Sequence, residues 1–317
     1  MDDTSEILPG IARPTQKNAV PAGRATVFLR RLASFIVLWA IVLGAVFSGN
    51  RIISDYLFLV IITLLGVFGL LEFYGLVERR GLACFKCVGV IGGIVLMFGT
   101  FLHCTGKLGI HDSPSRVNDF QAALLVCIVL GLCIRQLAAG PNLTGLTAIS
   151  TTLLGLIYVP WLLNFVQAIN YFPTIEGKGR FYLLYFLVVT KFSDSGAYAV
   201  GSVLGRHKLS PRISPAKTWE GFFGAVIVSA LASVLFAQVA ADYLPGMKTV
   251  HAIVLGVLLG AAAAVGDLVE SLFKREAGVK DSGNLLPGIG GVLDLLDSLL
   301  FNAPIMYLYL RHVLTHP

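Results

Sequence analysis

Charged residues are scarce in this chain of 317 residues, where Asp, Glu, Lys and Arg together make up 13% of the sequence. An average soluble domain carries roughly 25%. Hydrophobic residues make up 56%, and a soluble helical bundle of this size would need more polar surface than the remainder provides. The composition therefore argues against a soluble globular protein and indicates one that is embedded in a membrane.

Cysteine is also rare, and its five copies form no metal-binding or disulfide pattern. Cys84 and Cys87 make a lone C-x-x-C, without a second pair and without a histidine at metal spacing. We interpret them, together with Cys104, Cys127 and Cys133, as small apolar packing residues. The net charge of +6 has no soluble basic domain to carry it, so we expect no nucleic-acid binding.

Long apolar runs are what the sequence does contain. They recur at lengths of about 20 residues, enough to cross roughly 30 Å of hydrocarbon. They predict an all-α, polytopic transmembrane helical bundle of about nine spans. The expected spans are 32–48, 56–74, 86–103, 120–137, 145–169, 181–200, 221–241, 250–270 and 291–310.

The distribution of Lys and Arg predicts the orientation in the membrane. With the N-terminus on one side, that side collects about sixteen cations and the other about seven, and the richer side is expected to face the cytosol. Residues 1–27 are polar and lack the apolar core of a signal peptide, so we expect a disordered cytosolic tail. A bare N-terminus of this kind suggests a bacterial inner membrane.

Ionisable residues are unevenly distributed among the predicted spans. The five spans within residues 28–180 are almost purely apolar, and we expect this region to be a transmembrane scaffold. A charge at mid-span costs at least about 2.5–3.5 kcal/mol and usually marks function, so residues 181–317 are predicted to be the catalytic region. Its spans contain Lys191, Asp194, Asp267, Glu270, Asp294 and Asp297. For each of them, and above all for Glu270 and Lys191, an interhelical salt bridge or a position near the headgroups is the structural alternative.

The eighth predicted span carries a polar stripe at its end. Asp267, Ser271 and Lys274 are spaced i, i+4, i+7, so they share one face of a helix. Arg275 and Lys280 add positive charge just beyond. Such a stripe combines a carboxylate, a hydroxyl and an ammonium group at the predicted cytosolic surface.

A glycine-rich turn, PGIGG, precedes the last predicted span. Free N–H groups at a helix start attract anions, and Gly290 and Gly291 would let a phosphate approach the backbone. Asp294 and Asp297 follow at i, i+3, where two carboxylates repel one another unless a cation lies between them. Mg²⁺ is the natural occupant. Together with the preceding cations, this pattern suits a metal–triphosphate site.

The loop after the sixth span is basic and turn-rich. It contains Arg206, His207, Lys208, Arg212 and Lys217, with serine–proline turns at 210–211 and 214–215. Such a loop could hold the phosphates of a nucleotide or a lipid.

At these residues the chain resembles the phosphatidate cytidylyltransferases, also called CDP-diacylglycerol synthases. The family pattern S-x-x-K-R-x4-K-D matches residues 271–281, and its glycine turn followed by two aspartates matches residues 287–297. D-x-x-A-Y-x-x-G matches 194–201, and S-P-x-K-T-W-E-G matches 214–221. The likeness covers roughly residues 145–310.

The resemblance implies the reaction CTP + phosphatidate → CDP-diacylglycerol + pyrophosphate, a step of phospholipid biosynthesis, with the active site facing the cytosol. It implies CTP and phosphatidate as partners and Mg²⁺ as cofactor, and it leaves open a second, monovalent cation and a homodimer. The implied metal ligands are Asp267, Asp294 and Asp297, with Asp281 in second rank. Catalytic roles fall to Asp267, Asp294 and Lys274, and substrate-binding roles to Ser214, Lys217, Ser271, Arg275, Lys280, Gly290, Gly291 and Asp194.

The chain departs from the family pattern at two positions. Ile289 stands where the family has histidine, and Leu295 where it has arginine. Neither replacement can donate a proton or bind phosphate, so we expect catalysis to rest on metal binding and substrate positioning.

Two other functions fit part of the pattern. One is a CTP-dependent transferase for another lipid phosphate or a lipid alcohol, because apolar spans do not disclose lipid chemistry. The other is an ion-coupled transporter, which typically has duplicated halves with broken helices. The charges here occur only in the second half, near the predicted cytosolic ends, which favours an enzyme.

Overall fold

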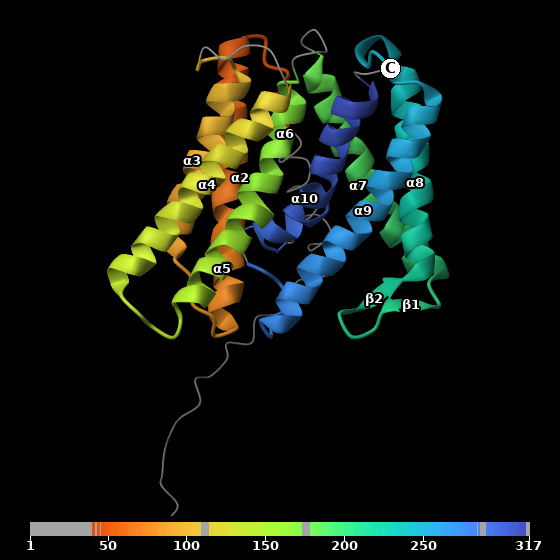
Figure 1. The fold of residues 1–317 in the computed structure, drawn as a ribbon. Coiled ribbons are helices and arrows are strands. Elements are labelled where there is room, and N and C mark those ends of the chain that lie inside the picture. Colours follow the sequence, from red (N-terminus) through yellow and green to blue (C-terminus); the bar gives the residue numbers. More distant parts are fainter. Residues whose placement is uncertain are drawn as a thin grey trace, which may run out of the picture.

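Long helices form nearly all of the structure, a computed structural model that describes residues 40–41, 43–44, 46–108, 114–172, 178–283, 285 and 290–314. The helices stand side by side, and a short hairpin lies at one end of the bundle, called the hairpin end below (Figure 1). In chain order the elements are α2 (Arg51–Arg79), α3 (Lys86–Cys104), α4 (Pro114–Ala139), α5 (Gly145–Leu156), η1 (Ile157–Trp161), α6 (Leu162–Asn170), α7 (Gly179–Leu204), β1 (Lys208–Ser210), β2 (Ser214–Thr218), α8 (Trp219–Val239), η3 (Ala241–Tyr243), α9 (Thr249–Glu276), α10 (Val292–Tyr309) and η4 (Leu310–Leu314). The predicted tail, residues 1–27, lies outside the described residues.

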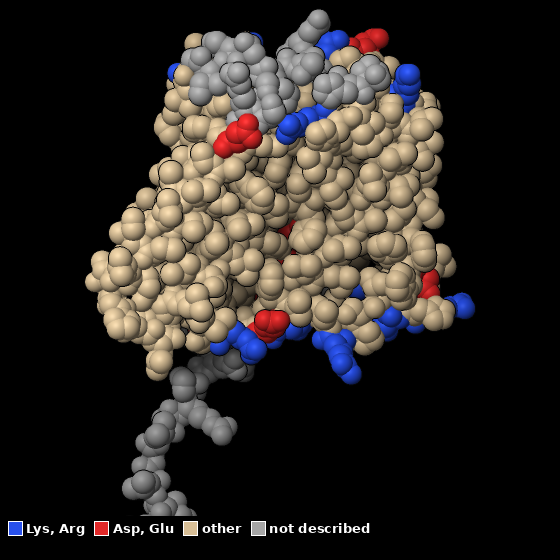
Figure 2. All heavy atoms as spheres, in the orientation of Figure 1, with Lys and Arg blue, Asp and Glu red and all other residues tan. Residues whose placement is uncertain are grey.

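Seven helical segments of the described chain are long and apolar enough to cross a membrane. They are Arg51–Arg79, Lys86–Cys104, Asn118–Ala139, Gly145–Asn170, Trp219–Val239, Thr249–Glu276 and Val292–Leu314. On the face shown in Figure 2, a broad band of uncharged side chains covers the middle of the bundle, and charged side chains gather toward its two ends. The prediction of an all-α, polytopic transmembrane bundle is confirmed.

The predicted number of about nine spans is not confirmed. The predicted span 181–200 falls on α7, which is 26 residues long. It is not among the seven because Lys191, Asp194 and the neighbouring serines make its second half too polar. The first predicted span, 32–48, lies largely outside the described residues.

Helices α7, α8 and α9 approach one another closely through small residues. A side chain added at Gly196 of α7 would meet Val228 and the carbonyl oxygen of Gly224 on α8, and one added at Gly224 would meet Val200. Gly260 of α9 lies equally close to α8. Small residues at such contacts let helices in membranes pack backbone against backbone. The close contact fixes the positions of the polar side chains that α7 and α9 carry.

A group of three aromatic side chains connects α2 to α9. The ring centroids of Phe73 and Tyr158 are 5.8 Å apart, and Phe273 lies 5.8 Å from Phe73 and 5.3 Å from Tyr158. Tyr158 belongs to the π-helical turn η1, which contains Pro160 and joins α5 to α6 within one span. These contacts hold the first half of the chain against α9, the helix that carries more of the predicted site residues than any other described helix.

The antiparallel hairpin β1–β2 is fixed over the ends of α7 and α8. The Thr218 hydroxyl caps α8 by accepting from the Gly221 N–H at 3.1 Å. Glu220 accepts the backbone N–H groups of Arg206 and His207, and it lies 2.6 Å from the His207 Nδ1 atom. The stretch K-T-W-E-G therefore has a structural role in shaping the hairpin.

Helix α10 begins part-way along the bundle (Figure 1). Its first turn is in the interior, since Gly291 is buried and the exposed fractions of Val292 and Leu293 are 1% and 0%. The first N–H groups of a helix have no partner within the helix. In an apolar interior these groups need an acceptor from elsewhere in the chain.

Candidate active site

A cavity of about 390 Å³ lies among α7, α8, α9, α10 and the hairpin, within the size range of small-molecule sites. Its polar lining includes Asp194, Lys217, Asp267, Asp294 and Asp297. Much of the remaining wall consists of small or apolar residues from α7, α8 and α9. Predicted site residues from separate parts of the sequence therefore meet at one cavity.

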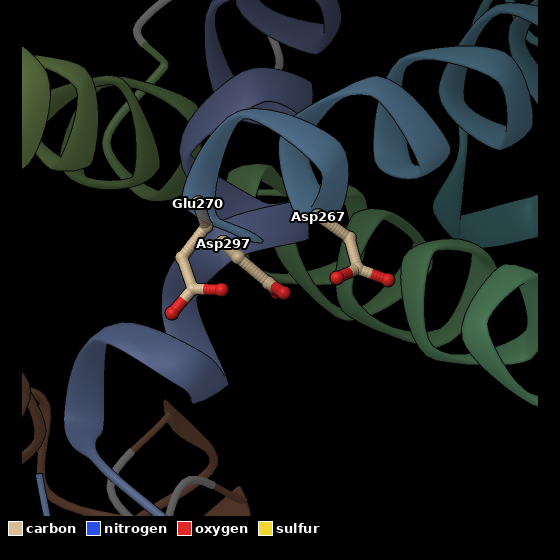
Figure 3. Close-up of side chains that lie close together, drawn as sticks. All are labelled: Asp267, Glu270 and Asp297. Carbon is tan, nitrogen blue, oxygen red and sulfur yellow. The ribbon is translucent and has the colours of Figure 1, made fainter. Parts of the chain in front are cut away.

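Three carboxylates converge beside this cavity and are called the acidic group below. Asp267 and Asp297 line the cavity, whereas Glu270 does not. Asp267 and Glu270 come from α9 and Asp297 from α10, and one oxygen of each lies within 4.8 Å of the others. In Figure 3 the Asp297 carboxylate lies between those of Glu270 and Asp267. Glycine at position 266 permits this approach, because a side chain there would meet the carbonyl oxygen of Asp297.

The acidic group fits a divalent metal ion. Glu270 is fully buried, with an exposed fraction of 0%, and its Oε1 atom has no hydrogen-bond partner in the described part of the chain. Asp297 forms no ion pair with any described Lys or Arg. Carboxylates this close repel one another unless a cation compensates them, and the burial of Glu270 strengthens the repulsion. Their oxygens are also the ligands that Mg²⁺ and Ca²⁺ prefer.

Three lysines neutralise part of the surrounding negative charge. Burial lowers the pKa of Lys217, on β2, while the neighbouring Asp267 acts in the opposite direction. The ion pairs are Lys191–Asp194 at 3.1 Å, Lys217–Asp267 at 2.8 Å, Lys274–Glu270 at 2.5 Å and Lys274–Asp294 at 2.6 Å. Lys191 and Glu270 therefore do form ion pairs, but each pair lies within one helix and is not the interhelical salt bridge that the sequence left open. Glu270 also belongs to the acidic group.

The carboxylate of Asp294, a predicted metal ligand, contacts Lys274, Gly291 and Ser282. Its Oδ1 atom lies 2.6 Å from Lys274, and its Oδ2 atom accepts from the Gly291 N–H at 2.7 Å and the Ser282 hydroxyl at 3.1 Å. Asp294 thus caps its own helix. It lines the cavity but is not one of the three carboxylates of the acidic group.

The N–H groups at the start of α10, expected to bind a phosphate, bind a carboxylate of the same chain. Glu72 on α2 accepts from the N–H groups of Val292 at 2.9 Å and Leu293 at 2.8 Å, and from the Ser282 hydroxyl at 2.9 Å. Gly290 and Gly291 do not line the cavity. The sequence did hold one signal for Glu72, a lone carboxylate inside an otherwise apolar span.

The other predicted substrate-binding residues lie at different distances from the cavity. Ser271 is buried on α9, with an exposed fraction of 6%. Ser214 begins β2 and does not line the cavity. Arg275 donates to the carbonyl oxygens of Ile213 at 3.1 Å and Val279 at 3.2 Å, so it joins the end of α9 to the hairpin.

Lys280 and Asp281 are exposed and form no ion pair or hydrogen bond with a described residue. Of the two departures from the family pattern, Ile289 lies outside the described residues, and the backbone carbonyl of Leu295 accepts from Lys191 at 3.4 Å. The roles assigned to the predicted site residues stay predictions.

Comparison with a protein-family model identifies the family to which the chain belongs. The model described as the cytidylyltransferase family matches residues 29–313. The chain belongs to this family. The match extends over all helices from α2 to α10, so it includes Glu72 as well as the acidic group. The chain is therefore a nucleotidyltransferase, and its apolar helices make it an integral membrane enzyme.

Individual relatives in the cytidylyltransferase family are similar over much of their length. The phosphatidate cytidylyltransferase of Bacillus subtilis is 31% identical over 274 residues, which cover 86% of this chain and 96% of that protein. The phosphatidate cytidylyltransferase of Haemophilus influenzae is 30% identical over 285 residues, 87% of this chain and 96% of that protein. The uncharacterized Escherichia coli protein YnbB is 37% identical over 202 residues, 62% of this chain and 65% of YnbB, just under two thirds of its length.

Proposed function

We propose that this membrane enzyme is a phosphatidate cytidylyltransferase, which transfers the CMP moiety of CTP to phosphatidate. The observation that carries the proposal is the acidic group at a cavity between membrane-spanning helices, beside Lys217. Relatives with this name, aligned over nearly their whole length, support the choice of phosphatidate over other lipids.

Asp267, Glu270 and Asp297 would hold Mg²⁺. Bound there, the ion would neutralise charge on the triphosphate and orient the departing pyrophosphate. Asp294 and Asp281 remain the further ligands that the sequence predicts. Whether the enzyme also binds a second, monovalent cation is left open. A homodimer is likewise left open.

The protein residues position the substrates. Lys217 lines the cavity, where its ammonium group can meet a phosphate oxygen. A phosphatidate oxygen attacks the α-phosphorus of CTP, a new P–O bond forms, and the bond from the α-phosphorus to the bridging oxygen breaks and releases pyrophosphate. The second pKa of a phosphomonoester is about 6, so the attacking group is already an anion at neutral pH. No histidine is needed as a base, and none lines the cavity in the described part of the chain.

The cavity suits a substrate that stays in the bilayer. Its walls include Ala197 and Tyr198 of α7, Phe222 of α8 and Ala263 of α9, so the acyl chains would remain among apolar residues while the phosphate reaches the lysines. Lys and Arg gather at the hairpin end (Figure 2). We place this end at the cytosolic face of a bacterial inner membrane, where CTP is available.

Turnover by the purified protein tests the function. With Mg²⁺, CTP and phosphatidate we expect release of pyrophosphate together with CDP-diacylglycerol, and we expect EDTA to abolish both and added Mg²⁺ to restore them. Release with another lipid phosphate, but none with phosphatidate, would assign the enzyme to that lipid instead. Absence of CTP turnover with every lipid phosphate and lipid alcohol would contradict the proposal.

A further inference from the structure

The contact between Glu72 and the start of α10 joins two distant parts of the sequence. Glu72 lies on α2, in the predicted scaffold region, about two turns before that helix ends at Arg79. Its two carboxylate oxygens accept from the first two N–H groups of α10. A negative charge at this place also interacts favourably with the positive end of the helix dipole.

Gly283 and Gly291 lie directly against this carboxylate. A side chain at Gly283 would collide with the Glu72 carboxylate, and one at Gly291 would collide with both Glu72 and the Ser282 hydroxyl. The space that glycines often leave for a phosphate is therefore filled by Glu72. A phosphate could not occupy it at the same time, because the two anions would overlap and repel one another.

The start of α10 determines where its two aspartates lie. Asp294 is in the first turn, and Asp297 is one turn further along the same helix. The Ser282 hydroxyl lies within hydrogen-bond distance of both Glu72, at 2.9 Å, and Asp294, at 3.1 Å. Displacement of the first turn of α10 would therefore move Asp297 relative to Asp267 and Glu270 on α9.

We propose that Glu72 is a positioning residue for the transfer reaction: it anchors the start of α10 and thereby keeps Asp297 in the acidic group. Its effect on turnover rests on the proposed function, whereas its effect on metal binding does not. Glu72 does not line the substrate cavity. It lies instead in an open cleft with Arg79 and Ser282, which gives small solutes a route to it.

The test compares Glu72→Ala and Glu72→Gln with Glu78→Ala. Glu78 lies on the same helix, pairs with Lys86 at 3.2 Å and has a side chain that is 51% exposed, so it is a matched control. For Glu72→Ala we expect kcat to fall about 10- to 100-fold, the range seen when residues that orient metal ligands are removed, with a smaller change in the KM for CTP. Glu72→Gln keeps one acceptor oxygen and should retain more activity than Glu72→Ala.

Metal binding supplies a readout that does not need turnover. A ligand that binds only the folded protein raises the midpoint of thermal unfolding. We expect Mg²⁺ to raise this midpoint in the unaltered chain and in Glu78→Ala, and to raise it much less in Glu72→Ala. Sodium formate should restore part of the Mg²⁺ effect in Glu72→Ala by supplying a carboxylate to α10, whereas sodium chloride at equal ionic strength should not.

The outcomes separate this inference from the proposed function. If Glu72→Ala lowers the midpoint without Mg²⁺ but keeps the Mg²⁺ effect and kcat, Glu72 only stabilises the fold and the inference is wrong. If Glu72→Ala does not fold, Glu72→Gln decides by the same two readouts. If the unaltered chain binds Mg²⁺ but does not turn over phosphatidate, the proposed function fails, and the Mg²⁺ effect on the variants still decides the role of Glu72.

Discussion

Asp297 is the member of the acidic group whose negative charge is least compensated by lysine. Asp267 pairs with Lys217, and Glu270 pairs with Lys274. Among the described residues, Asp297 has no lysine or arginine as an ion-pair partner, and its one hydrogen bond is from the adjacent N–H of Ser298, at 2.5 Å. A carboxylate in this setting gains most from a bound cation.

The first prediction concerns this side chain. Asp297→Asn removes a charge from the acidic group at almost constant volume, and we expect turnover to fall at least about 100-fold, because even groups that only orient metal ligands contribute 10- to 100-fold. The Mg²⁺-induced rise of the thermal midpoint should disappear as well. Asp242→Asn is the matched control, since Asp242 is exposed in η3, does not line the cavity and has no predicted role at the site. Equal losses in both variants would remove Asp297 from the metal site.

Asp294→Asn separates the two roles open to its side chain. If Asp294 mainly caps α10 and pairs with Lys274, the variant should unfold at a lower temperature and still show the Mg²⁺ effect, because Asp267, Glu270 and Asp297 remain. Loss of the Mg²⁺ effect with an unchanged midpoint in its absence would instead identify Asp294 as a ligand, as the sequence predicts.

At the scale of elements, the contact between α7 and α8 determines how the cavity is walled. Gly196, Gly201, Gly221 and Gly224 all lie at this contact, each with atoms of the facing helix close to the position of a missing side chain. Two of them, Gly201 and Gly221, end the family motifs that begin at Asp194 and Ser214. These glycines bring the two backbones together, and Gly201 and Gly221 also line the cavity.

Gly196→Val should therefore destabilise the bundle. We expect a loss of about 1–3 kcal/mol, the usual cost of overpacking, seen as a lower midpoint of thermal unfolding in detergent. Gly131→Val on α4 is the control, because nothing lies within 4 Å of the position that its side chain would take. If the two variants unfold at the same temperature, the α7–α8 contact is looser than described.

At the scale of the whole molecule, Lys and Arg side chains gather at the hairpin end of the bundle (Figure 2). The hairpin end includes Arg212 in the turn between β1 and β2, whereas Lys248 precedes α9 at the opposite end. The positive-inside rule assigns the hairpin end to the cytosol. The site would then face the compartment that contains CTP.

Cysteine labelling tests this orientation. In a chain whose five cysteines, all free, are replaced, Lys248→Cys should react with a membrane-impermeant maleimide in intact cells. Arg212→Cys should react only in inverted vesicles. Both positions are exposed, so accessibility within the protein is matched. The opposite labelling pattern would place the active site outside the cytosol and contradict the proposed localisation.

The sequence alone determined the class of the protein and the region of its site. Apolar runs of bilayer length require helices, because no other open structure satisfies backbone hydrogen bonds in lipid. Charges are costly there, so Asp194, Asp267, Asp294 and Asp297 stand out among the apolar residues of the sequence. The i, i+7 spacing of Asp267 and Lys274 also predicted that the two residues share one face of the helix that is α9.

Tertiary structure alone decided which of these groups meet. Asp297 joins Asp267 and Glu270, and Asp294 faces Lys274, because the close approach of α10 to α9 at Gly266 sets the rotation of one helix against the other. The anion at the start of α10 comes from Glu72, 220 residues earlier than Val292. Sequence periodicity describes the faces of single helices. Contacts between distant helices depend on how the whole bundle packs.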